Sequence, residues 1–300
     1  MKRALELLHC ARFAPPLDCA EACARVLREH GVDLSRARAR TGFARGHLLD
    51  VVVYVPGGLG DARESDAAEA LVRLVLGEEL FERWVGSVLA APTVRGGPLT
   101  VLNPNAEEAS ALPVAALPET ARAAIAGLKL GMAAEPLAAH PDGEDWVFFE
   151  LEPVPAPDYP AQDDLLFSST RVPELKKSFL RGEPFFSGRF SNAGEIFVYL
   201  KYEAAAPGGQ SRLAERAQIE ATLARALRPE QGALVGLGLG VRYGYIDLAL
   251  IDPNCVEATL LPALRAAGVR ERAWLLFCDS ELAREWIGAH PESPEPYWGT

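Results

Sequence analysis

The order of strand-like and helix-like patterns over residues 194–290 constrains the fold of this chain more than any other feature of its sequence. Residues 194–203 alternate between apolar and polar side chains as a half-buried strand does, and residues 211–228 follow with helical spacing. Two glycine-rich strands come next, then a second helix closed by Gly268 and a short apolar strand. The order β-α-β-β-α-β predicts an antiparallel sheet with both helices on one face, the ferredoxin-like topology.

Residues 1–103 show the same order of elements. The expected elements are a strand at 3–13, a helix at 17–31, two strands within 36–56, a helix at 64–86 and a strand at 97–103. The stretches "RGHLLDVVVYVP" and "RYGYIDLALIDP" align without a gap, which places Arg45 with Arg242 and Asp50 with Asp247. The sequence therefore predicts an α+β fold with two ferredoxin-like (βαββαβ) halves. An internal duplication and a chance match both explain the alignment.

The two halves are separated by a middle segment, residues 104–193, that is rich in Pro and Ala. A helix beginning at Pro118, a strand at 145–153, a proline-rich loop and a short helix at 172–182 are expected there. Its apolar residues indicate that it packs against one half or both. The predicted boundaries are therefore 1–103, 104–193 and 194–290, followed by an extended tail, 291–300.

Composition restricts the class of partner. The formal net charge is −11 and the pI is near 5.1, whereas nucleic acids and anionic membranes require a cationic protein surface. No run of 18 apolar residues is present, the N-terminus lacks the features of a secretory signal, and the odd number of cysteines, five, favours reduced thiols. We expect a cytoplasmic protein that binds neither nucleic acid nor membrane, and its oligomeric state stays open.

The strand predicted within residues 242–252, "RYGYIDLALID", has two contrasting faces. Its alternation puts Ile246, Leu248 and Leu250 beneath the helices, so that Tyr243, Tyr245 and Asp247 occupy the opposite face. The neighbouring strand adds Phe197 and Tyr199 to that face. Tyrosine is suited both to an internal interface and to a binding surface, because its ring buries area while its hydroxyl finds a partner. Base stacking on RNA is a third alternative, which the acidic charge and the missing RNA-binding motif disfavour.

Motifs that carry catalytic or cofactor chemistry are absent from the sequence. The glycines at 236, 238, 240 and 244 run into a strand rather than a helix N-terminus, so they indicate a hairpin, a bulge or close backbone approach instead of a phosphate site. Cys19 and Cys23 share a helix face, which is typical of small buried side chains as well as of a metal site. We expect no cofactor and no metal, and no catalytic residue is identified.

These observations lead to one functional hypothesis and one alternative. The hypothesis is a non-enzymatic binding protein, of the immunity or accessory-subunit type, that engages a protein partner through the aromatic face and the adjacent Arg242. The alternative is an enzyme or small-molecule sensor that uses a groove between the halves, lined by Arg45, Asp50, Arg242 and Asp247. An exposed aromatic patch favours the hypothesis, whereas a concave pocket with converging polar groups favours the alternative.

Overall fold

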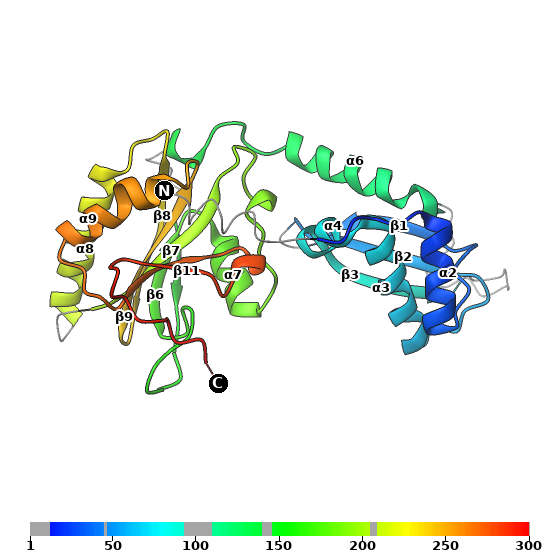
Figure 1. The fold of residues 1–300 in the computed structure, drawn as a ribbon, viewed down its shortest axis with the longest axis horizontal. Helices are drawn as coiled ribbons and strands as arrows, with labels where there is room; N and C mark the ends of the chain where they lie inside the picture. Colours follow the sequence, from blue (N-terminus) through cyan, green and yellow to red (C-terminus); the bar gives the residue numbers. More distant parts are fainter. Residues whose placement is uncertain (1–12, 45–46, 93–109, 140–145, 205–208, 300) are drawn as a thin grey trace. The chain divides into compact units, whose positions relative to one another are not determined.

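The computed structural model of the 300-residue chain describes residues 13–44, 47–92, 110–139, 146–204 and 209–299. Within them the chain forms an α+β fold with seven α-helices and two sheets (Figure 1). Two compact units divide it, an N-terminal unit from Arg12 to Met132 and a C-terminal unit that contains Ala133 to Thr300. The boundary between the units therefore falls inside the segment 104–193. No helix in the described ranges has the length and apolar character needed to cross a membrane.

The N-terminal unit packs helices on a four-stranded sheet. Its elements are α2 (Cys19–His30), β1 (Arg38–Phe43), β2 (Leu49–Val55), α3 (Ala62–Leu76), α4 (Glu78–Trp84), β3 (Val85–Pro92), β4 (Leu112–Pro113) and α6 (Leu117–Leu130). The Asp18 side chain caps the start of α2, and Gly31 ends that helix in the left-handed conformation. Leu71 of α3 and Val51 and Val53 of β2 are among the fully buried core residues.

The strand order of this sheet is β3-β2-β1-β4, with β2 and β3 parallel and the other neighbours antiparallel. A parallel pair arises because α3 and α4 form a crossover that returns the chain in the same direction. The ferredoxin-like duplication predicted from the sequence is therefore not confirmed. The expected strand at 97–103 and nearly all of that at 3–13 lie outside the described residues, and the strand Val85–Pro92 was not predicted.

The C-terminal unit is built on a seven-stranded sheet in the order β11-β10-β7-β9-β8-β6-β5. The strands are β5 (Val147–Glu150), β6 (Leu165–Thr170), β7 (Ile196–Glu203), β8 (Gly232–Gly240), β9 (Tyr243–Leu250), β10 (Ala273–Phe277) and β11 (Trp286–Gly288). The helices are α7 (Pro173–Arg181), α8 (Gly209–Ala226), a π-helical turn (Val256–Leu260) and α9 (Leu261–Ala266). All neighbouring strands are antiparallel.

The predicted elements of residues 194–277 form in the expected order, but one neighbouring prediction is wrong and one strand was not predicted. The sequence of residues 281–288, "ELAREWIG", predicts one or two turns of helix. It is a 3-10 turn at Ser280–Leu282 and then β11 instead, because Trp286–Gly288 pair with the edge of β10. The strand Leu165–Thr170 was not predicted, although it joins the middle segment to the sheet through β8. Backbone pairing between distant segments decides both cases.

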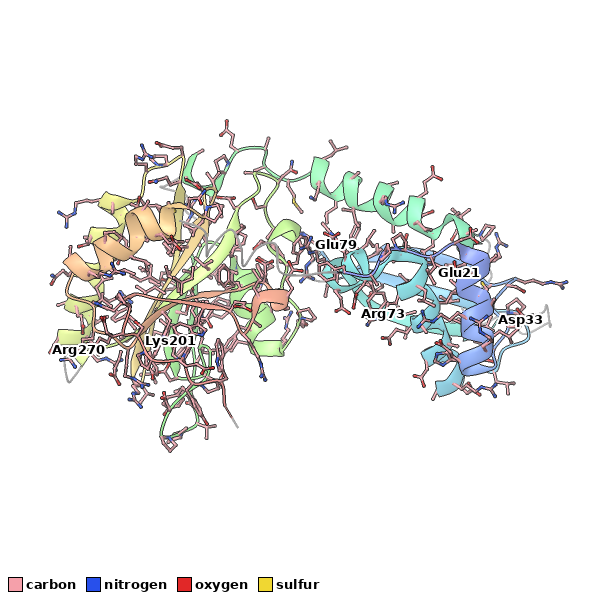
Figure 2. The ribbon with its side chains drawn as sticks, in the orientation of Figure 1. Glu21, Asp33, Arg73, Glu79, Lys201 and Arg270 are labelled. Carbon is pink, nitrogen blue, oxygen red and sulfur yellow. The ribbon has the colours of Figure 1, made fainter. Side chains whose placement is uncertain are left out.

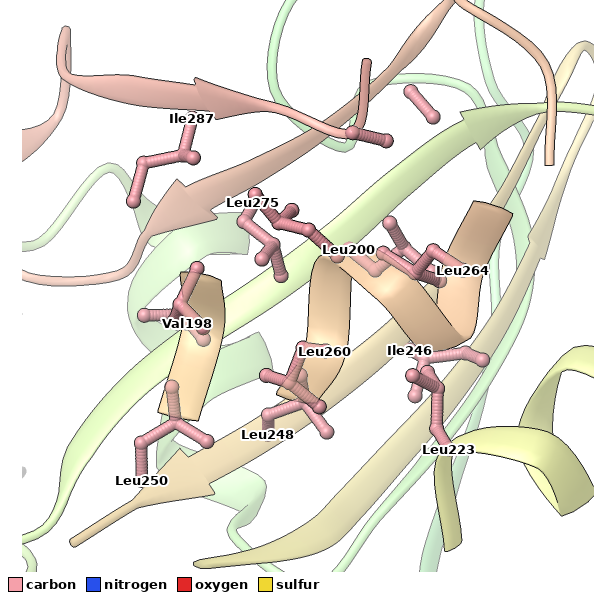
Figure 3. Packing of buried hydrophobic residues seen from close by; sticks show 14 of the residues in the cluster. Val198, Leu200, Leu223, Ile246, Leu248, Leu250, Leu260, Leu264, Leu275 and Ile287 are labelled. Atoms are coloured by element: carbon pink, nitrogen blue, oxygen red, sulfur yellow. The ribbon is translucent and has the colours of Figure 1, made fainter. Parts of the chain in front are cut away.

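The helix-covered face of this sheet carries the apolar row that the alternation predicts. Val198 and Leu200 of β7 and Ile246, Leu248 and Leu250 of β9 pack with the inner faces of α8 and α9 (Figure 3). Leu200, Ile246, Leu248 and Leu250 are completely buried. This layer holds β7 and β9 rigidly and so positions the side chains on their opposite face.

Candidate functional site

The opposite face of β7 and β9 is covered by other segments of the same unit. Phe197, Tyr199, Tyr243, Tyr245 and Asp247 are at most 7% exposed. The loop between β5 and β6, helix α7 and the C-terminal Trp298 supply the covering side chains. These five residues form no exposed aromatic patch, and they line the interior of the C-terminal unit.

Asp164 fastens the β5–β6 loop to the start of β9. Its carboxylate accepts hydrogen bonds from the backbone N–H groups of Arg242 and Tyr243, at 2.7 and 2.8 Å, and from the Tyr245 hydroxyl. A Cβ at Gly240 would overlap the Asp164 carboxylate. The glycine on β8 is therefore required for space, and the covering loop has a fixed position.

Arg242 belongs to an ion-pair network at the edge of this covered face. Its guanidinium lies 2.6 Å from Glu203 and 3.7 Å from Asp158, and Arg272 lies 2.8 Å from Asp158. The Tyr243 hydroxyl donates to Asp158 at 2.6 Å, and burial followed by this hydrogen bond raises the pKa of Tyr243 to about 12. Arg242 pairs with Glu203 and not with Asp247, because it precedes β9 and lies at the edge of the covered face.

Lys201 extends the same network into the interior. It is 1% exposed, lies 4.2 Å from the centre of the Tyr243 ring and donates to the backbone carbonyl of Tyr159. Figure 2 labels Lys201 within the C-terminal unit. Burial lowers the pKa of Lys201 to about 8, although Asp164, Asp158 and Asp163 act in the opposite direction. These contacts hold Lys201 against the β5–β6 loop.

A cavity of about 330 Å³ opens between α7 and the sheet. Its apolar walls are Leu175 and Phe179 of α7 with Phe185 and Phe277, and its rim includes Ala283. Polar side chains from several separate segments of the unit meet on its lining. A largely apolar concave site with a few converging polar groups is the usual form of a small-molecule site.

The main polar group of the cavity is a buried ion pair between Lys176 and Asp247. The Lys176 ammonium lies 2.9 Å from one Asp247 oxygen and donates to the other at 3.1 Å, and both side chains are 2% exposed. Lys176 also donates to Gln162 Oε1 at 2.6 Å, and Gln162 Nε2 makes a long hydrogen bond of 3.5 Å to Asp247. The opposite charges neutralise each other within this cluster.

Gly236 provides the space for the Asp247 carboxylate. It lies opposite Asp247 on β8, directly after an irregularity in the pairing, and a Cβ there would overlap the Asp247 carboxylate. The hairpin and the bulge that the glycines of β8 indicated are both present, because β8 pairs with β9 directly after a short turn and the pairing is irregular between Leu234 and Gly236. The glycines at 236, 238 and 240 also leave room for neighbouring side chains. A glycine at position 236 is therefore needed for the Asp247 carboxylate to occupy its place in the cavity lining.

Tyr199 and Cys278 also line the cavity, together with Ser178, Glu183 and Ser280, and both the Tyr199 hydroxyl and the Cys278 thiol stay protonated. Burial is the main reason that the pKa of Tyr199 and the pKa of Cys278 lie well above their usual values, and the Asp247 charge adds to both shifts. A neutral phenol donates a hydrogen bond, whereas a neutral thiol is a poor nucleophile. The cavity is therefore equipped for recognition through hydrogen bonds.

Two of the predicted site residues, Arg45 and Asp50, belong to the N-terminal unit. Asp50 lies on β2 of the N-terminal unit, where it accepts a hydrogen bond from Ser87 Oγ at 2.7 Å, and Arg45 lies outside the described residues. Lys176 and Gln162 were missed, because a lysine on a short helix and a glutamine in a loop are typical of exposed positions. Only the tertiary fold brings them to Asp247.

The cysteines and histidines near the N-terminus give no metal site within the described ranges. Burial is the largest of the causes that raise the pKa of Cys23 to about 11, and neighbouring Cys19 adds to the shift. His9 and Cys10 lie outside the described residues. No family model, curated protein or solved structure matches the chain, so the geometry of the site carries the functional interpretation.

Proposed function

We propose that the C-terminal unit binds a small molecule in the cavity between α7 and the sheet, as a sensor or binding protein of the cytoplasm. The observation that carries this proposal is the ion pair of Lys176 and Asp247 on the lining of a cavity whose other walls are mainly apolar. A buried ion pair adds little net stability to a fold, because desolvation offsets the attraction between the charges. Its location beside an accessible volume supports a role in recognition.

The test uses the full chain and toluene as an apolar probe, with binding followed by ligand-observed NMR. Toluene binding is expected in the wild type and is expected to be lost in Ala283→Trp, since the indole ring fills the entrance. Ala217→Trp is the matched control, because Ala217 is exposed on α8 and does not line the cavity. Equal binding by all three proteins, or absence of binding to the wild type, contradicts the proposal.

Protein binding is a second candidate, supported by a different surface from the one expected. Phe148 on β5 and Phe167 on β6 are 78% and 53% exposed, and β5 is the last strand of the sheet. Exposed aromatic residues beside an unpaired strand edge are typical of a binding surface. A partner should be captured by the wild type and by Leu130→Ser, which alters an exposed leucine elsewhere, and lost by Phe148→Ser/Phe167→Ser.

We propose that β7 to β10 and the helices between them have the ferredoxin-like topology. The order β-α-β-β-α-β and the antiparallel strand order β10-β7-β9-β8 support it.

A further inference from the structure

We infer that the ligand of this cavity is a small neutral molecule whose carboxamide group binds Tyr199 and Gln162 and whose apolar or aromatic body fills the rest. This inference rests on the small-molecule function proposed above and specifies the chemical class of the ligand.

The first observation is the hydroxyl group of Tyr199. Tyr199 lines the cavity and is 7% exposed, yet its hydroxyl has no hydrogen-bond partner among the described residues. The two other tyrosines on this face donate to carboxylates, Tyr243 to Asp158 and Tyr245 to Asp164. Buried polar groups are normally paired, so the Tyr199 hydroxyl supplies an unused donor for a ligand.

The second observation is the incomplete hydrogen bonding of Gln162. Its Nε2 makes one long hydrogen bond of 3.5 Å to Asp247, and its Oε1 accepts one from Lys176 at 2.6 Å. An amide nitrogen has two N–H donors and an amide oxygen has two acceptor sites, so one of each is unused by these bonds. A ligand carboxamide offers the matching pair, because its oxygen accepts and its N–H donates.

The charge of the cluster selects a neutral ligand. Lys176 and Asp247 neutralise each other at 2.9 Å, and Glu183, which also lines the cavity, lies 3.8 Å from Arg181. An entering carboxylate or ammonium group would therefore lose its water without gaining an uncommitted counter-ion. Tyr199 stays protonated because burial raises its pKa, and it therefore acts as a hydrogen-bond donor. The aromatic rings of Phe179, Phe185 and Phe277 favour an aromatic body.

The test compares four probes that share one ring: benzamide, benzoate, benzylamine and toluene. Their affinities for the full chain are measured at neutral pH by ligand-observed NMR titration. Benzamide is expected to bind most tightly. Tyr199→Phe is expected to weaken benzamide binding roughly 3- to 10-fold, the effect of one lost hydrogen bond, and to leave toluene binding unchanged. Tyr297→Phe is the matched control, because Tyr297 lies outside the cavity.

The outcomes separate the two proposals. The carboxamide inference is overturned if Tyr199→Phe binds benzamide as tightly as the wild type, or if benzoate or benzylamine binds more tightly than benzamide. Toluene binding that Ala283→Trp abolishes would then still support the cavity function. If no probe binds to the wild type, both proposals fail. The probe series needs only the wild type, so it decides the question even if a variant does not fold.

Discussion

The N-terminal and C-terminal units place their charged side chains in different environments. The ion pair Arg25–Glu29 of the N-terminal unit is about half exposed at both ends, whereas Lys176 and Asp247 of the C-terminal unit are each 2% exposed. An exposed pair contributes little to stability because water already solvates both charges. A buried pair requires each partner, since removal of one leaves an unsolvated charge. Removing one partner of a salt bridge should therefore cost much more stability in the buried pair of the C-terminal unit than in the exposed pair of the N-terminal unit.

The sheets explain why the buried charges occur in one unit. Every residue of β9 is buried, because helices cover one face of the strand while α7 and the β5–β6 loop cover the other. In β2 of the N-terminal unit, two of the seven residues are only partly buried, and Asp50 is one of them. In a strand covered on both faces, every polar side chain needs a hydrogen-bond or ionic partner within the protein. The buried Asp247 therefore needs a buried counter-ion, Lys176, whereas the partly buried Asp50 accepts a hydrogen bond from Ser87 and remains partly solvated.

The largest expected effect is the loss of the buried cation. Lys176→Met should lower the free energy of unfolding of the C-terminal unit by about 3–5 kcal/mol, because Asp247 stays buried without its counter-ion. Urea unfolding followed by tryptophan fluorescence measures this in a Trp84→Phe background, where the remaining tryptophans all lie in the C-terminal unit. Lys176→Met/Asp247→Leu should recover most of the loss. A loss below about 1 kcal/mol for the single variant would remove the contrast between the units.

A rise in pH should weaken the C-terminal unit more than the N-terminal unit. Burial raises the pKa of Cys255 from 9.0 to about 11, and it also raises the pKa values of Cys278, Tyr199, Tyr243 and Tyr245. The unfolded chain loses these protons first, so stability is present below the unfolded pKa and is lost as pH rises above about 9. Cys255 alone should account for about 2 kcal/mol at pH 11.

The contribution of Lys201 to stability changes with pH in the opposite direction to that of the buried cysteines and tyrosines. Its folded pKa of about 8 lies below the usual 10.5, so its contribution to stability increases between those two pH values. Lys201→Met should therefore make the alkaline loss steeper, as measured by urea unfolding under reducing conditions from pH 7 to pH 11. In the N-terminal unit, Cys23 is the one group with a raised pKa within the described residues. A C-terminal unit whose stability stays constant up to pH 11 would show that these shifts are absent.

Replacing a glycine that lies opposite a charged residue should lower the free energy of unfolding more than replacing a glycine elsewhere. Gly236→Ala should destabilise the C-terminal unit by about 1–3 kcal/mol, because the new methyl group overlaps the Asp247 carboxylate. Gly42→Ala on β1 is the control, since nothing lies within 4 Å of its added Cβ, and it should be neutral or slightly stabilising. Equal effects at the two positions, measured by urea unfolding, would mean that Asp247 moves aside at no cost.

The smallest effect is expected for the exposed ion pair. Arg25→Ala should change the free energy of unfolding of the N-terminal unit by at most about 0.5 kcal/mol, because Arg25 and Glu29 are both half exposed. Urea unfolding followed by circular dichroism measures this change. A loss of 2 kcal/mol or more would show that surface and buried pairs do not differ as described.

The sequence determined the parts of the fold that depend on local pattern. The alternation in β7 and β9 distinguished Val198, Leu200 and Leu248 from the aromatic side chains on the other face, because side chains alternate along any strand. Capping residues and prolines likewise marked the helices, as Pro118 does in the first turn of α6. Each of these features requires only neighbouring residues.

The tertiary structure alone decided what covers the aromatic face and which groups meet there. Asp247 is paired with Lys176, 71 residues earlier in the chain, and with Gln162 from a loop whose sequence specifies only irregular backbone. The cavity exists because α7, the loop and the sheet do not fill the space beside this cluster. Periodicity reports which side of a strand is buried, but the identity of the partner depends on long-range packing that no local pattern encodes.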